Sequence, residues 1–551
     1  MTDAPARTAV LDVGGMTCDD CAHHVTAALD KAGATDISVA WQTGQAHFTW
    51  PSDMPETELR SAVVAAGYRP GALRLSTAGE RTTPDTALDY DLVVVGAGSA
   101  AFAAAIKATE AGYRVALVEE GVLGGTCVNI GCVPSKALLR AGELAWTAGH
   151  HPFAGLATSS GPVDLAALVG QKDELVGALR QAKYADLVQD YGFEVIPGHA
   201  RFVGPDRLDV DGRTVSAGVF LVATGASPSA PPIPGLAEAG FLTSTTALNL
   251  TEVPARLAVI GANAVGLELG QFFLHLGAEV TFLDVAVRIA PFEEPEVSEA
   301  LADALRALGA RILAPADVLG VERAAGRLDV KVRAGDNEIV LTVDQVLVAT
   351  GRRPNTSDLG LEVAGIALDA RGAVVVDDQL RTSNPRVFAA GDVTGGPQFV
   401  YVSAYEGALA VDNALLGADR SVDFTGLPKV TFTLPQVASA GLTEAQARSA
   451  GHDVVTSVLP LEAVPRALVN RDTHGLVKLV AEVETGRLLG ASVVADGAGD
   501  VIQAAVLAIR HGLTTDELAA TFHPYLTMAE GIKLAAQTFT RDVHKLSCCA
   551  A

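Results

Sequence analysis

The sequence predicts an α/β protein with two Rossmann-like units and an α+β block, preceded by a ferredoxin-like module, and three patterns support this prediction. A strand, a glycine-rich turn and a helix follow one another twice, around Gly96 and around Gly261. Residues 8–75 fit the order β-α-β-β-α-β. After about residue 425 the pattern changes to strands near 454–459 and 476–483 and helices near 500–511.

The composition favours several folded domains. The chain has 551 residues, 49% of them hydrophobic, which excludes disorder for most of its length. Its 40 lysines and arginines stand against 64 aspartates and glutamates, and the net charge of −24 argues against nucleic acid and anionic membranes as partners. We find no signal-peptide pattern and no unbroken apolar run of membrane-spanning length. We therefore expect a cytoplasmic protein without membrane insertion.

The six cysteines form three close pairs. A disulfide framework would spread its cysteines over many loops, whereas isolated pairs in a reducing compartment indicate dithiols that react or bind a soft metal ion. The three pairs are Cys18 with Cys21, Cys127 with Cys132, and Cys548 with Cys549.

The N-terminal module begins with a strand and a cysteine-containing loop. Ala9–Val13 is the expected first strand, and the loop from Gly14 to Cys21 leads into a helix that ends at Leu29. The remaining expected elements are strands at 37–40 and 46–50, a helix at 56–66 and a closing strand at 73–75. The polar residues 76–89 are then expected to form a linker.

The first glycine turn follows the G-x-G-x-x-G/A rule. The strand 91–95 precedes Gly96, which makes the turn, and Gly98, which lets the backbone approach a pyrophosphate. Ala101 allows close packing of the following helix. A second strand ends at Glu119, where a carboxylate binds ribose hydroxyls, so the pattern predicts a dinucleotide site.

The second glycine turn is less regular. Gly261 and Gly266 keep their places, but Asn263 occupies the middle glycine position, which we expect to be tolerated because asparagine adopts left-handed backbone more readily than most residues. Asp284 ends the next strand and favours a free ribose 2′-hydroxyl. Arg288 would partly offset this preference. A packing unit without a ligand remains the alternative interpretation.

Cys127 and Cys132 lie just after the first dinucleotide motif, in the segment GGTCVNIGCVPSK. An adjacent helix N-terminus and Lys136 are expected to lower the pKa of a thiolate here. A structural disulfide or a pair of buried thiols is the alternative, but it does not explain why the pair lies beside a dinucleotide site.

The segment GGTCVNIGCVPSK resembles the redox-active segment of the flavin disulfide reductases, such as glutathione reductase and lipoamide dehydrogenase. VFAAGDV at 387–393 resembles their second flavin motif, and the two Ala-Thr-Gly segments at 223–225 and 349–351 resemble their paired ATG segments. The resemblance covers residues 90–540 and implies FAD, a nicotinamide donor and a homodimer. It implies that Cys132 faces the flavin, that Cys127 meets the substrate, and that Lys136 and Glu268 pair near flavin N5.

On this resemblance, the expected cofactor residues fall into two sets. The set for FAD is Gly96, Gly98, Ala101, Glu119, Gly124, Thr126, Lys136, Thr224, Gly225 and Asp392. The set for NAD(P)H is Gly261, Asn263, Gly266, Asp284, Arg288 and Gly351.

The C-terminal region departs from the disulfide reductases. These enzymes carry a His-Pro-Thr segment followed by Glu, and the His acts as a general acid and base. Aligning Thr527 and Glu530 with that pattern puts Tyr525 in the place of the His, whereas aligning His523 keeps the His but loses the Glu. We favour the first alignment. A phenol with a pKa of about 10 is a poor base, which disfavours disulfide chemistry.

The other two cysteine pairs point to a soft metal. GMTCDDC, from Gly15 to Cys21, resembles the GMTCxxC loop of heavy-metal-associated domains, in which two thiolates hold a soft cation. Cys548 and Cys549 lie two residues before the end of the printed chain, and a tail of this kind is suited to ligand exchange.

The combination resembles the mercuric reductase family. HPYLTMAEGIKLAAQTF, the final Cys-Cys pair and Ala182-Lys183-Tyr184 carry this resemblance. It implies that Tyr184 and Tyr525 flank Hg(II), or its thiol complexes, beside Cys127 and Cys132. It also implies transfer of the metal from Cys18/Cys21 through Cys548/Cys549 of the other subunit, followed by reduction with NAD(P)H through FAD.

Two alternative functions remain. One is a flavin-dependent thiol-disulfide reductase, and the other is a metal-binding or trafficking protein. The donor also stays open, because Asp284 favours NADH while the resemblance implies NADPH. The expected domains are a heavy-metal-associated domain at 8–75, a linker at 76–89, FAD-binding parts at 90–250 and 378–425, an NAD(P)H-binding domain at 251–377, a dimerisation domain at 426–541 and a Cys-Cys tail at 542–551.

Overall fold

The computed structural model describes residues 7–16, 19–41, 44–50, 55–76 and 88–542. Contacts divide the chain into two units, Met1–Leu88 and Asp89–Ala551, and each is described here by itself. Within the described residues, no helix combines the length and the apolar character needed to cross a membrane.

The N-terminal unit has the predicted β-α-β-β-α-β order. Its antiparallel sheet has the strand order β2-β3-β1-β4, and Leu11, Val25, Phe48 and Leu59 are buried in its core. Its elements are β1 (Arg7–Gly14), α1 (Asp19–Lys31), β2 (Thr35–Ala40), β3 (Gln45–Trp50), α2 (Glu56–Ala65) and β4 (Arg69–Ser76).

The large unit begins with a Rossmann-like layer. Its sheet has the strand order β7-β6-β5-β10-β9-β8, with β20 pairing parallel to β10. The parallel centre is buried and rich in valine, as expected for strands covered on both faces. The elements up to Val222 are β5 (Tyr90–Val95), α3 (Ser99–Glu110), β6 (Val115–Glu119), β7 (Glu194–Pro197), β8 (Ala200–Gly204), β9 (Arg207–Val210) and β10 (Arg213–Val222).

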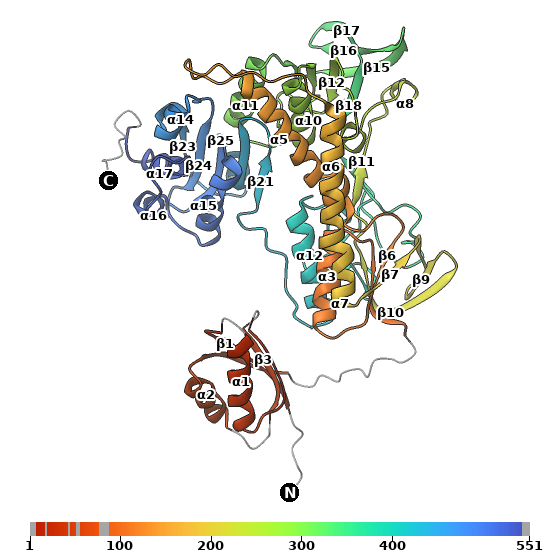
Figure 1. The fold of residues 1–551 in the computed structure, drawn as a ribbon, viewed down its shortest axis with the longest axis vertical. Helices are drawn as coiled ribbons and strands as arrows, with labels where there is room; N and C mark the ends of the chain where they lie inside the picture. Colours follow the sequence, from red (N-terminus) through yellow and green to blue (C-terminus); the bar gives the residue numbers. More distant parts are fainter. Residues whose placement is uncertain (1–6, 17–18, 42–43, 51–54, 77–87, 543–551) are drawn as a thin grey trace. The chain divides into compact units, whose positions relative to one another are not determined.

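A helical excursion separates β6 from β7. It carries the cysteine pair on two consecutive helices and then runs along α6, the long helix in Figure 1. Its elements are α4 (Gly125–Ile130), α5 (Cys132–Gly149), α6 (Leu165–Arg180), a π-helical turn at Gln181–Ala185 and α7 (Asp186–Tyr191).

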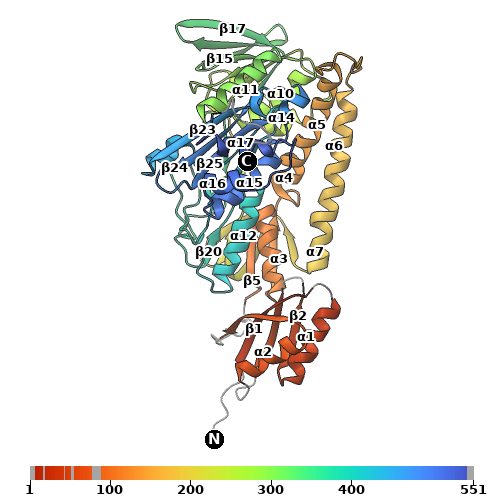
Figure 2. The ribbon, with the colours of Figure 1, turned by 90° about the vertical axis from the view of Figure 1, so that its left-hand side faces the viewer.

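The second Rossmann-like layer has a parallel sheet with the order β14-β13-β12-β18. A three-stranded antiparallel sheet, β15-β16-β17, lies at one end of this unit in both views (Figure 1, Figure 2). Its elements are β12 (Arg256–Ile260), α10 (Ala264–His275), β13 (Glu279–Leu283), α11 (Pro295–Ala307), β14 (Arg311–Leu313), β15 (Asp317–Ala324), β16 (Arg327–Ala334), β17 (Asn337–Val343) and β18 (Gln345–Val348).

The chain then returns to the first layer. α12 packs beside α3 (Figure 2), and this close approach needs glycine at 407, because a Cβ there would collide with Ala100 O. The connecting elements are β11 (Ala226–Pro228), α8 (Leu236–Ala239), α9 (Ser244–Ala247), β19 (Arg352–Pro354), β20 (Val387–Ala389), a 3₁₀ turn at Asp392–Thr394 and α12 (Val400–Ala414).

The C-terminal block is α+β, as predicted. Its antiparallel sheet has the order β21-β22-β25-β24-β23. Its elements are β21 (Pro428–Thr431), β22 (Gln436–Gly441), α13 (Glu444–Ser449), β23 (Val454–Pro460), a 3₁₀ turn at Leu461–Ala463, α14 (Pro465–Asn470), β24 (Leu476–Glu482), β25 (Leu488–Ala495), α15 (Ala498–Arg510), α16 (Thr515–Ala520) and α17 (Glu530–Gln537). The predicted fold class is confirmed.

Candidate functional site: a dithiol beside two dinucleotide turns

The first glycine turn has no room for side chains. Gly96 has a φ of 110°, and a Cβ there would lie 2.5 Å from Ala223 O. Gly98 is the N-cap of α3 and offers no side-chain cap, so the N–H groups of the first helical turn are available to a phosphate. Ala101 is fully buried behind this turn. α3 begins at Ser99, which brings its N-terminus directly to the glycines.

Glu119 lies at the end of β6, where the motif predicts it. Its Oε1 accepts the Gly121 N–H at 2.7 Å, and burial raises the pKa of the carboxyl group. A carboxylate at the end of this strand fits hydrogen bonding to ribose hydroxyls.

A buried arginine belongs to the candidate cofactor site at the first glycine turn, which is called the first cradle below. The Arg352 guanidinium lies 3.6 Å from Asp392 Oδ2, measured from Nε, and its Nη2 lies 3.5 Å from Thr126 Oγ1. Burial lowers the pKa of Arg352 and raises that of Asp392. The buried Nε has no hydrogen-bond partner among the described residues, so an acceptor on a bound cofactor would satisfy it.

Two further positions close this cradle. Gly125 has a φ of 61°, and a Cβ there would lie 2.6 Å from Gly98 Cα, so the cysteine segment meets the phosphate turn closely. Thr224 Oγ1 donates to Asn355 O at 2.6 Å, and Gly225 follows with a φ of 71°. The glycine turn, the uncapped helix and the orphaned arginine nitrogen together fit FAD.

The second glycine turn repeats the geometry of the first. Gly261 has a φ of 98°, a Cβ there would lie 2.5 Å from Ala349 O, and a Cβ on Gly266 would collide with Gly261 O. Gly351, with a φ of 122°, lies on the facing segment. Asn263 has a φ of −111°, so this position does not use the left-handed backbone that asparagine tolerates, and the turn forms without it. The middle position is extended, and α10 begins directly after it without a side-chain cap.

Asp284 and Arg288 both make contacts within their own domain. The two oxygens of Asp284 accept the N–H groups of Ala262 at 2.7 Å and Ala286 at 2.8 Å. Arg288 donates to Ser298 Oγ and to two backbone carbonyls, each at 3.2 Å. Asp284 therefore fixes the turn that would hold the nucleotide, and the roles of both residues toward the ribose stay predictions.

The cysteine pair is asymmetric. Cys127 lies on α4, Cys132 is the first residue of α5, and both are thiols in this structure. A hydrogen bond from the Cys127 thiol, together with the positive charge of Lys136, lowers the pKa of Cys132 to about 7. The same hydrogen bond to the Cys132 thiolate raises the pKa of Cys127. Cys132 is therefore the cysteine of the pair that ionises more readily near neutral pH.

Lys136 and Glu268 form the expected ion pair. Lys136 Nζ lies 2.5 Å from Glu268 Oε2, and the other oxygen of the mostly buried Glu268 accepts the Phe432 N–H at 2.8 Å. Lys136 Nζ also stands 4.6 Å from the centroid of the Phe432 ring. These contacts hold the lysine one helical turn after Cys132.

Tyr184 lies beside the pair. A Cβ on Gly124 would come within 3.2 Å of its ring, and Phe102 packs against that ring edge-on at a centroid distance of 4.7 Å. Burial raises the pKa of its phenol, which hydrogen-bonds Ser99. The π-helical turn at Gln181–Ala185 carries this residue.

Tyr525 lies elsewhere, on the segment that joins α16 to α17 in the C-terminal block. It is 59% exposed, and the next residue, Leu526, has a φ of 63°. His523 Nδ1 lies 3.2 Å from Thr521 O, and no ion pair to an acidic residue orients its ring among the described residues. The structure therefore places Tyr184, but not Tyr525, with the cysteine pair of the same chain, and it offers His523 no carboxylate partner.

Cys18, Cys548 and Cys549 lie outside the described residues. Cys21 lies in the first turn of α1 and is half-buried. Within the part of the chain that the structure covers, no cluster of three or more histidine, cysteine or acidic residues is arranged for a metal ion. The metal sites at the two ends of the chain stay predictions.

Sequence reasoning missed Arg352 and Ser99. Arg352 directly follows the second Ala-Thr-Gly segment, so its position beside a predicted cofactor motif was a signal that could have identified it. Ser99 lies inside the first glycine motif, where only the glycines and Ala101 were considered.

Family comparisons agree with this geometry. Residues 90–407 match the family described as pyridine nucleotide-disulphide oxidoreductase, and residues 427–536 match its dimerisation domain. Residues 10–69 match the heavy-metal-associated domain. This family uses FAD and a pyridine nucleotide, and the dimerisation domain indicates a homodimer.

The chain also matches relatives along its whole length. It is 50% identical to a mercuric reductase of Staphylococcus aureus over 540 residues, covering 98% of each chain. It is 52% identical to a mercuric reductase of Streptomyces lividans, covering 84% of this chain and 98% of that one.

Solved structures show the same core. The Cu(II) complex of the HOCl-induced flavoprotein disulfide reductase RclA from Escherichia coli has a TM-score of 0.74 and 32% identity, covering 82% of this chain and 99% of that one. LpdA from Mycobacterium tuberculosis has a TM-score of 0.74 and 28% identity, covering 82% and 100%. The chain belongs to the pyridine nucleotide-disulphide oxidoreductase family, within its mercuric reductase group that carries an N-terminal heavy-metal-associated domain.

Proposed function

We propose that the protein reduces Hg(II) by the reaction NADPH + Hg(II) → NADP+ + H+ + Hg(0). The observation that carries this proposal is the Cys127–Cys132 pair next to the first dinucleotide turn, in which Cys132 ionises more readily. Thiolates are the ligands that soft metal ions prefer. The whole-length relatives named mercuric reductase support the choice of metal.

FAD, when bound, supplies two-electron chemistry between the nucleotide and the cysteine pair. Gly96, Gly98 and the N-terminus of α3 would hold its pyrophosphate, Glu119 its ribose, and Asp392 its ribityl chain. Gly261, Gly266 and the N-terminus of α10 would hold the pyrophosphate of the nucleotide.

The two cysteines have different tasks. Cys127 would meet the incoming Hg(II), and its proton would leave when the metal binds its sulfur. Cys132, whose pKa is about 7, ionises more readily and would supply the second thiolate. Lys136, fixed by Glu268, stabilises the Cys132 thiolate while the metal is absent.

Tyr184 stands beside this dithiol, and its phenol stays protonated at neutral pH because burial raises its pKa. A neutral hydroxyl donates a hydrogen bond to a thiolate but does not remove a proton from a leaving thiol. Tyr525 would reach the site only from a second copy of the chain, which the dimerisation domain supports.

We further propose that the terminal cysteine pairs deliver the metal. Cys18 and Cys21 would receive Hg(II) on the N-terminal module, and Cys548 and Cys549 would pass it to the Cys127–Cys132 site of the other subunit. Each step exchanges one thiolate for another, so the ion stays bound while it moves. A reducing cytoplasm would keep these dithiols available.

The nucleotide is proposed to be NADPH, with NADH as a second donor. Asp284 disfavours a 2′-phosphate, but its oxygens already accept two backbone N–H groups. The Arg288 guanidinium donates within its own loop. The ratio of kcat/KM for the two donors measures this preference directly.

An anaerobic stopped-flow titration tests the proposal. The flavoprotein is first reduced with NADPH or with NADH and is then mixed with Hg(II) in excess thiol. Flavin reoxidation and the release of mercury vapour are followed together. We expect rapid reoxidation in the native protein and none in Cys127→Ser or Cys132→Ser.

Two controls separate the alternatives. Cys548→Ser with Cys549→Ser should slow turnover of mercury and leave any reduction of a small disulfide unchanged. Fast disulfide reduction with no response to Hg(II) would identify a thiol-disulfide reductase. A protein without flavin that still binds mercury would identify a metal carrier.

A further inference from the structure

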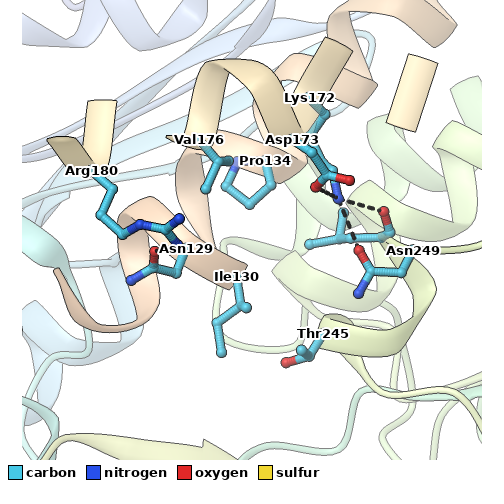
Figure 3. Close-up of a pocket in the computed structure, with 10 residues that line it drawn as sticks. Asn129, Ile130, Pro134, Lys172, Asp173, Val176, Arg180, Thr245 and Asn249 are labelled. Atoms are coloured by element: carbon cyan, nitrogen blue, oxygen red, sulfur yellow. Dashed lines mark hydrogen bonds and ion pairs between the residues drawn. The ribbon is translucent and has the colours of Figure 1, made fainter. Parts of the chain in front are cut away.

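A pocket of about 330 Å³ lies against the two helices that carry the cysteine pair. Asn129 and Ile130, which follow Cys127 on α4, line it together with Pro134, which follows Cys132 on α5. α6, α9 and the two residues after α9 form its remaining walls (Figure 3). Its size is that of a small-molecule site, and three of its lining residues follow the cysteines closely on the same two helices.

The charges in this pocket are not balanced. Lys172 is buried, and its Nζ lies 2.7 Å from Asp173 Oδ1 and donates to Asn249 Oδ1 at 2.9 Å (Figure 3). Its charge is therefore compensated. Arg180 makes no ion pair with any described residue, so one positive charge is left for a ligand.

Asn129 ties Arg180 to the helix of Cys127. The Asn129 amide donates to Leu123 O at 2.8 Å and to Gly125 O at 2.9 Å, which orients its Oδ1 outward. That oxygen accepts a long hydrogen bond of 3.3 Å from Arg180 Nη1. One hydrogen-bonded nitrogen leaves the other guanidinium donors available, and a guanidinium binds a carboxylate best through two parallel bonds.

Arg180 also shares a helical run with Tyr184. Residues four apart on a helix face the same side, and Tyr184 contacts the cysteine segment at Gly124. The guanidinium and the phenol thus project from the same side of this helical run. On a chain with a net charge of −24, a local positive charge is needed to hold an anionic ligand there.

We propose that this pocket binds the carboxylate of a small thiol that carries Hg(II) to the enzyme. This inference rests on the proposed reduction of mercury. The step is a ligand exchange: Cys127–SH + RS–Hg–SR → Cys127–S–Hg–SR + RSH. The new bond joins Hg to the Cys127 sulfur, the bond from Hg to one RS group breaks, and the Cys127 proton goes to the leaving sulfur without any redox change.

Two thiols of matched size test the inference. Hg(II) is presented to the full-length holoenzyme with excess 3-mercaptopropionate or with the uncharged 3-mercapto-1-propanol. For Arg180→Gln, losing a charge-assisted hydrogen bond should raise KM about tenfold with the carboxylate thiol. KM with the alcohol should stay within about twofold, and Arg180→Lys should recover part of the preference.

Arg140→Gln is the matched control, because Arg140 is an exposed cation on α5 that pairs with Glu143 at 2.7 Å. It should leave both KM values unchanged. Equal effects of Arg180→Gln on the two thiols, at native flavin content, would overturn the inference while leaving mercury reduction intact. Absence of turnover with both thiols in the native protein would instead contradict the proposed function.

Discussion

Lys136→Met should raise the pKa of the Cys132 thiol, and the direction and size of this change follow from the site. Two main influences hold that pKa at about 7: the hydrogen bond from Cys127, which is the larger, and the charge of Lys136. Burial and the negative charge of Glu268 oppose them. Removing Lys136 therefore removes the second influence and leaves the first.

The magnitude is limited by solvent. A cation close to an acid lowers its pKa by roughly one to three units, but Lys136 is one-third exposed and shared with Glu268, so we expect a rise of about one unit. At pH 7 the thiolate fraction would then fall from about one half to about one tenth. Glu268→Gln removes an opposing charge and should move the pKa slightly in the other direction.

Alkylation of the reduced protein with iodoacetamide measures this change, because only the thiolate reacts. Peptide mapping reports the rate at Cys132 as a function of pH. The rate at pH 7 should fall about fivefold in Lys136→Met and stay unchanged in Arg140→Met, a control on the same helix. An unchanged pH profile in Lys136→Met, or a rise in the pKa in Glu268→Gln, would refute the electrostatic account.

Three further predictions concern cofactor binding and stability. Gly96→Ala places a Cβ 2.5 Å from Ala223 O at a φ of 110°, so the purified variant should lack the yellow flavin, and a fully flavinated variant contradicts the cradle. Arg352→Met should weaken FAD binding by about 1.5–3 kcal/mol in a fluorescence titration, and native affinity would show that its orphaned nitrogen does not meet the cofactor. Lys478→Met leaves three carboxylates around a buried site without their cation. The free energy of unfolding measured in urea should fall by about 3–5 kcal/mol, and an unchanged urea midpoint would contradict this prediction.

Local patterns made much of this site predictable. Gly96 and Gly261 are followed within a few residues by the helices they introduce, so a short segment determines both turns. The cysteine pair and Lys136 are also close in sequence. Glu268 was placed with Lys136 only through a family resemblance, because 132 residues separate the two and no periodicity links them.

The remaining features depend on tertiary contacts. Arg352 reaches Asp392 and Thr126 from a strand far along the chain, so sequence spacing does not indicate the contact. The backbone at Asn263 is not left-handed, because only the first position of each turn has a positive φ. The residue chemistry at Asn263 suggested a special conformation that the fold does not use.

The three cations near the cysteine pair explain how one acidic chain can both stabilise a thiolate and bind an anionic carrier of the metal. Lys136 is paired with Glu268, and Arg352 stands opposite Asp392, so an acidic partner holds each of these cations in place near the Cys132 thiolate. Arg180 has no acidic partner among the described residues. A positive charge that is already paired orients and stabilises a neighbour, whereas an unpaired one binds anions. The pairing of each cation, rather than the net charge of the chain, therefore separates the groups that prepare the thiolate from the group suited to recognise what brings the metal.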